Sequence, residues 1–327
     1  MAAPRRPAGA RALGLFWIAV LVLGAAGAGT LHVLGPLPKP EPLAPSPAAP
    51  SAAAPAWDGR IAAPVPALLE LSAFPPALLP RIGADGRMPR AVYARPAVAD
   101  GRPRVALVLA GLGLADADTR AAIERLPGPV TLAFSAYSPD PDPLLALARA
   151  GGHELLQSLP MEPEGAPFDN PGDRALTTSL RPAENLRHLE WVMGRTQGYV
   201  GLTGASDGMR GERFAALASG FNMALDAINR RGLLYLDPRP TEGRAADPLP
   251  ATHVRTDYVL DDPPGRADID AKLVALERLA RERGSAVGLA GQIRPATLDK
   301  IVAWAHAAEG RGIQLVPVSA LAVEPAR

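Results

Sequence analysis

The sequence predicts an α/β fold in which a parallel sheet is covered by helices. The first observation is the apolar run at 105–109 (VALVL), which lies between Arg104 and a glycine-rich turn and is typical of a strand buried on both faces. The second is the alternation of short apolar runs with amphipathic helical stretches, which continues to residue 318. About seven such units in roughly 220 residues suit a closed or nearly closed barrel. An open, doubly wound sheet is the alternative.

The chain begins with a basic flank that is followed by a long uncharged stretch. Residues 1–11 contain three arginines and no acid, and residues 12–34 contain no Asp, Glu, Lys or Arg. About 20 apolar residues suffice to cross a bilayer as a helix, and a basic flank stays in the cytoplasm. We therefore predict a single-pass transmembrane helix at 12–34 in an inner membrane, with the C-terminal domain in the periplasm. Ala26-Gly27-Ala28 resembles a cleavage site, so a signal peptide that releases the protein into the periplasm is the alternative.

Two segments separate this stretch from the first expected strand. Residues 35–67 are rich in Pro and Ala, and proline at this density disfavours helices and sheet ladders, which predicts a disordered linker. Residues 68–103 begin with leucines and a phenylalanine that can dock on a folded domain, and continue with a part rich in Gly, Pro and charge. We expect this second segment to wrap the surface of the domain at 104–322.

Turn residues and periodicity define the elements in the first half of that domain. Residues 115–126 have a helical apolar face and end at Pro127-Gly128, and residues 130–134 (VTLAF) predict the second strand. A helix at 143–150 ends at Gly151-Gly152 and precedes a strand at 154–159. After a loop rich in Gly and Pro, we expect a helix at 182–194 and a short strand at 199–202.

The second half continues the alternation. Residues 213–231 carry apolar side chains at helical spacing, which predicts one long helix capped by Gly232. A strand at 233–236 ends at Asp237, and the segment at 253–259 is expected to be extended. A helix at 268–284, a strand at 286–290, a helix at 296–311 and a last strand at 313–318 complete the domain.

Composition excludes several classes of function. The formal net charge of +1 provides no field that would attract nucleic acid, so we expect no nucleic-acid partner. The absence of cysteine excludes disulfides, thiolate metal sites and a cysteine nucleophile. Gly111-Leu112-Gly113 lacks the third glycine of a GxGxxG motif, which argues against a nucleotide cofactor.

Seven short segments occur in an order that is typical of one family. They are VALVLAGLG at 105–113, LPGPVTLAFSAY at 126–137, GHELLQSLPMEP at 152–163, GYVG at 198–201, RRGLLYLDPRP at 230–240, RPATL at 294–298 and IQLVPVSAL at 313–321. On these segments the chain resembles the divergent polysaccharide deacetylase family, a branch of the carbohydrate esterases. The resemblance implies a deformed (β/α) barrel of the polysaccharide deacetylase type and a role in carbohydrate metabolism of the cell envelope.

The resemblance also implies where relatives with a metal site would hold the ion. They carry two Asp after the first strand, a His before the LPMEP-type segment, Asn-Asn-His after GYVG and Gly-His before RPATL. A divalent metal there would polarise an acetamide and activate water. The corresponding positions here are Ala110-Gly111, Ser158, residues 203–206 and Gly291-Gln292. The residues therefore do not support a metal site, and we expect no cofactor.

Charged residues that remain near the ends of the expected strands are the candidate site residues. Glu162 in the LPMEP turn and Asp237 at a strand end are candidate catalytic carboxylates, and the alternative for each is an ion pair or a cap. Asp237, Arg239, Arg294 and Asp207 are candidate substrate-binding residues, because carboxylates and guanidinium groups can bind sugar hydroxyls or carboxylates. His153 is expected to be structural, and Ser158 has no GxSxG motif around it.

Three hypotheses follow for the function. The first is a membrane-tethered, deacetylase-like protein that binds a cell-wall glycan or an envelope protein and has lost the metal site of the family. The second is an active deacetylase of N-acetylated sugars with a site rebuilt from Glu162, Asp207 and Asp237. The third is a purely structural scaffold for an envelope partner.

Overall fold

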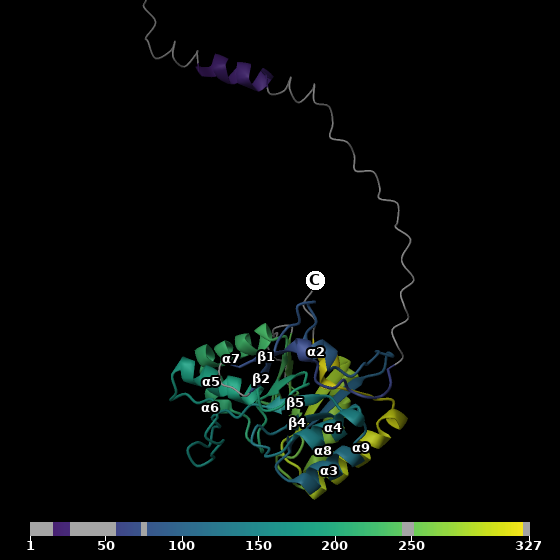
Figure 1. Ribbon diagram of the computed structural model, residues 1–327. Coiled ribbons are helices and arrows are strands. Elements are labelled where there is room, and N and C mark those ends of the chain that lie inside the picture. The colour runs from purple at the N-terminus through teal and green to yellow at the C-terminus, as the bar shows by residue number, and fades with distance from the viewer. Residues whose placement is uncertain (1–15, 27–56, 73–76, 244–251, 323–327) are drawn as a thin grey trace, which may run out of the picture. The chain divides into compact units, whose positions relative to one another are not determined.

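The computed structural model describes residues 16–26, 57–72, 77–243 and 252–322 (Figure 1). The chain divides into two compact units, Met1–Ala56 and Trp57–Arg327. In the first unit, residues 16–26 are helical, whereas the basic flank, the remainder of the stretch at 12–34 and the linker up to residue 56 lie outside the described residues. Within the described ranges, no helix is both long enough and apolar enough to span a bilayer.

A curled parallel sheet forms the centre of the second unit, and helices surround it (Figure 1). The described residues give it nine strands in the order β8-β7-β6-β5-β4-β3-β10-β9, with β11 paired to the start of β3. The strands are β3 (Arg104–Leu112), β4 (Thr131–Phe134), β5 (Leu155–Ser158), β6 (Gly201–Thr203), β7 (Leu234–Asp237), β8 (His253–Arg255), β9 (Tyr258–Val259), β10 (Ser285–Ala290) and β11 (Gln314–Val316).

The two ends of this sheet are joined by the chain itself. Strands β8 and β9 stand at opposite ends of the order, yet only Thr256 and Asp257 separate them in sequence. The N–H of Thr256 donates to the carbonyl oxygen of Asp237 in β7, and the N–H of Asp257 donates to that of Val287 in β10. The sheet is therefore curled into the wall of a deacetylase-type α/β fold, as the resemblance implied.

Helices cover the outside of this wall. They are α3 (Asp116–Arg125), α4 (Asp142–Ala150), α5 (Pro182–Met193), α6 (Glu212–Ala216), α7 (Ala218–Arg230), α8 (Arg266–Arg283) and α9 (Pro295–Ala307). Proline at the first position starts α5 and α9, and Gly284, with φ +85°, ends α8. The single helix expected at 213–231 is two helices, because Leu217 leaves the helical region (ψ 84°) and is 39% exposed.

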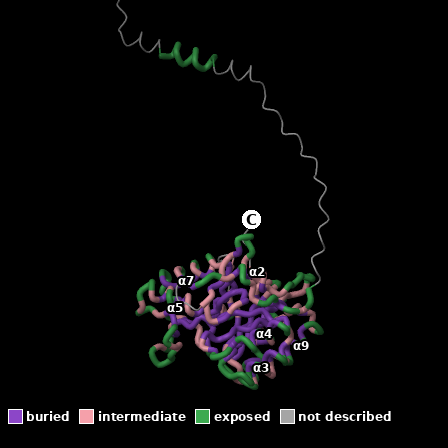
Figure 2. The backbone as a smooth tube through the Cα atoms, in the orientation of Figure 1, coloured by how far each residue is buried: buried purple, intermediate pink, exposed green. Residues whose placement is uncertain are grey.

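Alternate strand residues pack on opposite sides of the wall. Leu107 and Leu109 of β3 belong to the cluster under the helices, whereas Val108 of β3 packs in an inner cluster with Leu236 of β7 and Leu289 of β10. Because β3 and β7 are not neighbours in the sheet, this second cluster fills the inside of the curl. Figure 2 shows the buried chain at the centre and the exposed chain at the periphery.

The segment before β3 packs against the folded domain. It contains η1 (Pro66–Leu68), a hairpin of β1 (Leu69–Leu71) and β2 (Leu78–Pro80), and α2 (Pro89–Val92). Ile61, Leu68 and Tyr93 belong to the inner cluster. The folded unit thus begins at Trp57, inside the range that composition assigned to the linker, because the apolar side chain of Ile61 is buried despite the surrounding prolines.

Candidate functional site

A tight turn at residues 206–209 lies at the carboxyl edge of the sheet, where the fold would place a site. The N–H of Ser206 donates to the carbonyl oxygen of Met209 at 3.0 Å, and the N–H of Met209 donates to the carbonyl oxygen of Ser206 at 2.9 Å. Asp207 (φ 48°) and Gly208 (φ 82°) both have positive φ, as a two-residue type I′ turn requires. Aspartate and glycine are residues that tolerate this conformation, so the sequence encodes the turn locally.

This turn packs directly on the end of β10. The N–H of Gly208 donates to the carbonyl oxygen of Gly291 at 3.2 Å. The side-chain amide of Gln292 donates to both the backbone oxygen and Oδ1 of Asp207, each at 3.0 Å. A Cβ at position 291 would lie 3.2 Å from the Cα of Gly208, so the close approach favours glycine at both positions.

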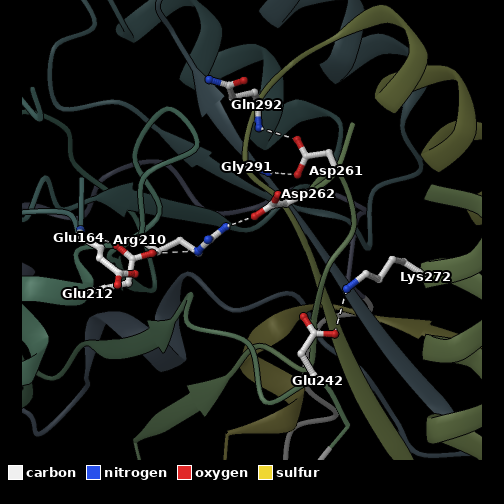
Figure 3. Close-up of polar contacts among 9 residues, drawn as sticks. All are labelled: Glu164, Arg210, Glu212, Glu242, Asp261, Asp262, Lys272, Gly291 and Gln292. Carbon is white, nitrogen blue, oxygen red and sulfur yellow. Dashed lines mark hydrogen bonds and ion pairs between the residues drawn. The ribbon is translucent and has the colours of Figure 1, made fainter. Parts of the chain in front are cut away.

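Two carboxylates hold the surrounding backbone in place (Figure 3). Asp261 is 6% exposed, and its oxygens accept the N–H groups of Gly291 at 2.8 Å and Gln292 at 3.1 Å. Asp262 accepts from Arg210 at 2.9 Å, and Arg210 also donates to Glu212 at 3.1 Å (Figure 3). The carboxylate of Asp261 therefore positions the end of β10, and Arg210 anchors the chain that leaves the turn.

A polar cavity of about 340 Å³, which we call the mouth cavity, lies beside this turn. Charged residues that line it include Asp207, Asp262 and Arg294. The guanidinium of Arg294 is exposed and has no hydrogen bond or ion pair with any residue that the structure describes. The other residues that line the mouth cavity are Asp169, Ala205, Gly208, Met209, Arg210, Val259, Asp261, Pro264, Leu289, Gly291 and Gln292.

Glu162 does not line the mouth cavity. Its Oε2 accepts the backbone N–H and the hydroxyl of Thr178, both at 2.6 Å, and its Oε1 lies 3.5 Å from Nη1 of Arg213. Partial burial acts to raise the pKa of Glu162, but the bonds from Thr178 and the charge of Arg213 outweigh it, so the pKa lies below its ordinary value. This carboxylate ties the loop after β5 to helix α6.

Asp237 and Arg239 pair with each other at the end of β7. Oδ1 of Asp237 accepts from the backbone N–H and Nε of Arg239 at 3.0 and 2.9 Å, and Oδ2 accepts from Nη2 at 2.6 Å. The guanidinium also lies over the ring of Phe221, 5.1 Å from its centroid. Of the five candidate residues, Asp207 and Arg294 line the mouth cavity, whereas Glu162, Asp237 and Arg239 do not.

Comparison with known proteins identifies the family. The model of the divergent polysaccharide deacetylase family matches residues 107–322. The chain belongs to this family.

Two relatives extend the comparison. A solved structure of an uncharacterized protein, ATU2773 from Agrobacterium tumefaciens C58, is 36% identical, has a TM-score of 0.68, and matches over 75% of this chain and 99% of that chain. The uncharacterized protein YibQ of Escherichia coli K12 is 25% identical over 178 residues, which is 53% of this chain and 53% of that protein. The chain thus spans about half the length of this curated relative.

At the positions where relatives would hold a metal ion, the described residues of this divergent polysaccharide deacetylase include no carboxylate and no imidazole. Ala110 and Gly111 offer no side-chain ligand, and the hydroxyl of Ser158 is buried without a hydrogen-bond partner. In the part of the chain that the structure describes, no group of three or more His, Cys, Asp or Glu side chains could hold a metal ion. Gly111 has φ +81°, and a Cβ there would lie 3.5 Å from the carbonyl oxygen of Gly291, so the chain that follows β10 occupies the space near this strand end.

His153 has a structural environment. Its Nδ1 lies 2.8 Å from the carbonyl oxygen of Val130, and its Nε2 lies 3.2 Å from that of Ile123. Burial lowers its pKa, although both carbonyl contacts oppose this effect. The ring joins α3 to the start of β4.

Sequence reasoning did not name three residues of the mouth as site residues. Asp261 and Asp262 follow the extended segment at 253–259 after Leu260, and Asp169 lies in a loop rich in Gly and Pro. Asp261 and Asp262 could have been predicted as site residues, because residues that follow strands lie at the edge of the sheet where sites form in such folds. Asp169 lies at the cavity because of the path that a long loop follows. The periodicity of the sequence does not predict the path of a loop.

Proposed function

We propose that this divergent polysaccharide deacetylase is a membrane-tethered, non-hydrolytic protein of the cell envelope that binds a cell-wall glycan at its mouth cavity. In this proposal, residues 12–34 anchor the chain in the inner membrane and the folded unit lies in the periplasm. The three arginines before an uncharged stretch support this topology. Release into the periplasm after signal cleavage is the alternative.

The observation that carries the proposal is the contrast between two adjacent regions of the mouth. Beside Ala110 and Gly111, where relatives would place metal-binding carboxylates, the side chains offer no ligand and the chain at Gly291 lies within van der Waals contact of a Cβ at Gly111. The neighbouring mouth cavity presents the carboxylates of Asp169 and Asp207 and the unpaired guanidinium of Arg294 to solvent. Such donors and acceptors suit sugar hydroxyls and acetamido groups.

An exposed aromatic ring adds to this support. Phe168 is adjacent to the cavity-lining Asp169 and is 96% exposed. The flat face of a sugar ring, which carries C–H groups, can pack on such an aromatic side chain. We therefore include Phe168 in the proposed glycan site.

The second hypothesis, an active deacetylase, needs Glu162, Asp207 and Asp237 to act at one point. Glu162 and Asp237 are each engaged by an arginine, and only Asp207 of the three lines the mouth cavity. This arrangement favours binding over hydrolysis. Hydrolysis remains an outcome of the test below.

The test measures binding and turnover on the same samples. The full chain in detergent is mixed with insoluble peptidoglycan or chitin and with soluble chitooligosaccharides, and bound protein, bound metal and released acetate are measured. We expect saturable binding without stoichiometric metal or acetate release. Arg294→Gln and Phe168→Ser should each weaken binding about tenfold, which corresponds to about 1.4 kcal/mol.

Arg278→Gln is the matched control, because Arg278 is an exposed arginine on α8, with an ion-pair distance of 3.9 Å to Glu282, and lies outside the mouth cavity. This variant should bind like the unchanged chain. Acetate release with bound zinc would establish the deacetylase alternative. Absence of glycan binding would overturn the proposal and leave the hypotheses of an envelope-protein partner and of a scaffold.

A further inference from the structure

A second cavity, separate from the mouth, lies beside helix α5. Its volume is about 720 Å³, roughly twice that of the mouth cavity, and the two cavities share no lining residue. We call it the α5 cavity. It is lined by Ala77, Leu78, Arg174, Leu180, Glu184, Arg187, His188, Trp191, Gly194, Arg195 and Gln197. Its size falls within the range of small-molecule sites.

Two guanidinium groups lie over the ring of Trp191, which lines this cavity. The Cζ of Arg195 lies 5.2 Å from the centroid of the Trp191 ring, and that of Arg174 lies 5.7 Å from it. Stacking uses the face of a guanidinium and leaves the N–H groups at its edge free for hydrogen bonds. The indole of Trp191 therefore positions Arg174 and Arg195 without forming hydrogen bonds to the guanidinium N–H groups that bind anions.

Arg195 and Arg174 differ in how many guanidinium N–H groups remain free to bind a ligand. Arg195 is fixed by bonds from Nε to the carbonyl oxygen of Ala136 at 2.9 Å and from Nη2 to that of Ser138 at 3.0 Å. Arg174 has an ion pair with Asp173 at 3.8 Å. Its side chain makes no hydrogen bond within the described ranges. Arg174 thus holds unused donors beside an aromatic ring.

The guanidinium N–H groups of Arg187 are also free to bind a ligand. Its ion pair with Glu184 measures 3.8 Å, whereas Glu184 accepts from Nε and Nη2 of Arg181 at 3.1 and 3.0 Å. The one carboxylate of the lining is therefore already engaged by Arg181, which does not line the cavity. Three guanidinium groups line the cavity, whereas its one lining carboxylate pairs with Arg181 and the carboxylate of Asp173 outside the lining lies 3.8 Å from Arg174, so positive charge remains in excess.

Three apolar side chains line another part of the cavity, beside the polar His188 and Gln197. Ala77 and Leu78 come from the segment that precedes β3, and Leu180 comes from the loop after β5. We propose that the α5 cavity binds a small anion that carries a carboxylate or phosphate group on a flat, apolar body. The anionic group would pair with Arg174 and Arg187, since guanidinium groups bind both anions with two parallel bonds, and the body would pack against Trp191 and the leucines.

The experiment titrates the full chain in detergent with benzoate, phenyl phosphate and the uncharged benzyl alcohol, followed by isothermal calorimetry. We expect one saturable site for at least one of the two anions and at least tenfold weaker binding of benzyl alcohol. The double variant Arg174→Gln/Arg187→Gln should weaken anion binding at least tenfold. These two side chains are 47% and 53% exposed, so the variant should fold, and circular dichroism verifies this.

Two controls separate this site from other cationic surfaces. Arg278→Gln, on α8, and Arg294→Gln, in the mouth cavity, should both leave anion binding unchanged. The inference is overturned if neither anion saturates at concentrations up to about 10 mM, if benzyl alcohol binds equally well, or if the double variant binds like the unchanged chain. Because the mouth is tested with glycans and the α5 cavity with anions, failure of one proposal does not affect the other.

Discussion

Glu154 is a fully buried carboxyl group at the start of β5, at the edge of the sheet opposite the mouth. Its oxygens accept the backbone N–H of Arg95 at 2.8 Å and that of Ser319 at 3.2 Å, together with the hydroxyl of Ser319. It thereby joins the segment before β3 to the C-terminal part of the domain. Burial raises the pKa of Glu154 from 4.5 to about 7, although these hydrogen bonds oppose the rise.

This raised pKa predicts how stability depends on pH. The folded protein binds the Glu154 proton more tightly than the unfolded chain does, so the contribution of Glu154 to the free energy of unfolding is largest below pH 4.5 and decreases until about pH 7. The total decrease is roughly 3 kcal/mol. In urea unfolding at several pH values, Glu154→Gln should remove this part of the decrease. Glu124→Gln, at an exposed position on α3, should keep it; an identical pH profile for Glu154→Gln would contradict the assignment.

At the scale of the element, the GYVG motif has a packing explanation. Gly201 begins β6, and a Cβ at this position would overlap the carbonyl oxygen of Leu234 in the neighbouring strand β7. Strands β6 and β7 are paired in parallel at these two residues. The glycine thus permits a close approach of two backbones within the wall.

We predict that Gly201→Ala lowers the free energy of unfolding by about 3 kcal/mol or more, because the backbone of β7 cannot move without disturbing the sheet. Gly310→Ala is the matched control, since no atom lies within 4 Å of a Cβ at that position. Its stability should be unchanged or slightly higher. Chemical denaturation measures both, and equal effects of the two substitutions would exclude the packing explanation.

The sequence predicted most elements of the domain, and the reasons are physical. The run at 105–109 is fully buried within β3, and prolines or glycines mark the ends of α4, α5 and α8, so local signals sufficed there. The break at Leu217 was missed because the apolar spacing continues through it. The docking of the 206–209 turn on β10 was also missed, since hydrogen bonds between positions about 85 residues apart leave no trace in local periodicity.

The candidate site was only partly predictable for a related reason. Asp207 and Arg294, both expected near the ends of strands, line one cavity. Position near the end of a strand did not predict that the guanidinium of Arg239 would pair with the carboxylate of Asp237, two residues before it. Whether a charged residue faces a cavity or its own neighbour is decided by side-chain packing, which the order of residues does not specify.

At the scale of the whole molecule, the segment at 57–103 is part of the folded domain. It contributes Ile61, Leu68 and Tyr93 to the inner cluster, and Arg95 bonds to Glu154. Burial of each large apolar side chain contributes about 1.5–3 kcal/mol, so loss of the segment removes an amount comparable to the total stability of a domain.

We therefore expect a chain of residues 57–327 to unfold at the same temperature as the full chain in the same detergent. A chain of residues 104–327 should be largely unfolded or aggregated, although it includes every strand of the curled sheet. Calorimetry and near-ultraviolet circular dichroism distinguish the two. A cooperative transition of the shorter chain near the original temperature would show that residues 57–103 are dispensable.

The two-residue link between β8 and β9 has a consequence for pairing with other chains. Sheets commonly recruit foreign chains through long outer strands whose backbone groups lack partners. Here the terminal strands of the sheet contain three and two residues, and the peptide between them bonds to β7 and β10. Within the described ranges, the two end strands of the curled sheet thus offer only short templates for intermolecular pairing.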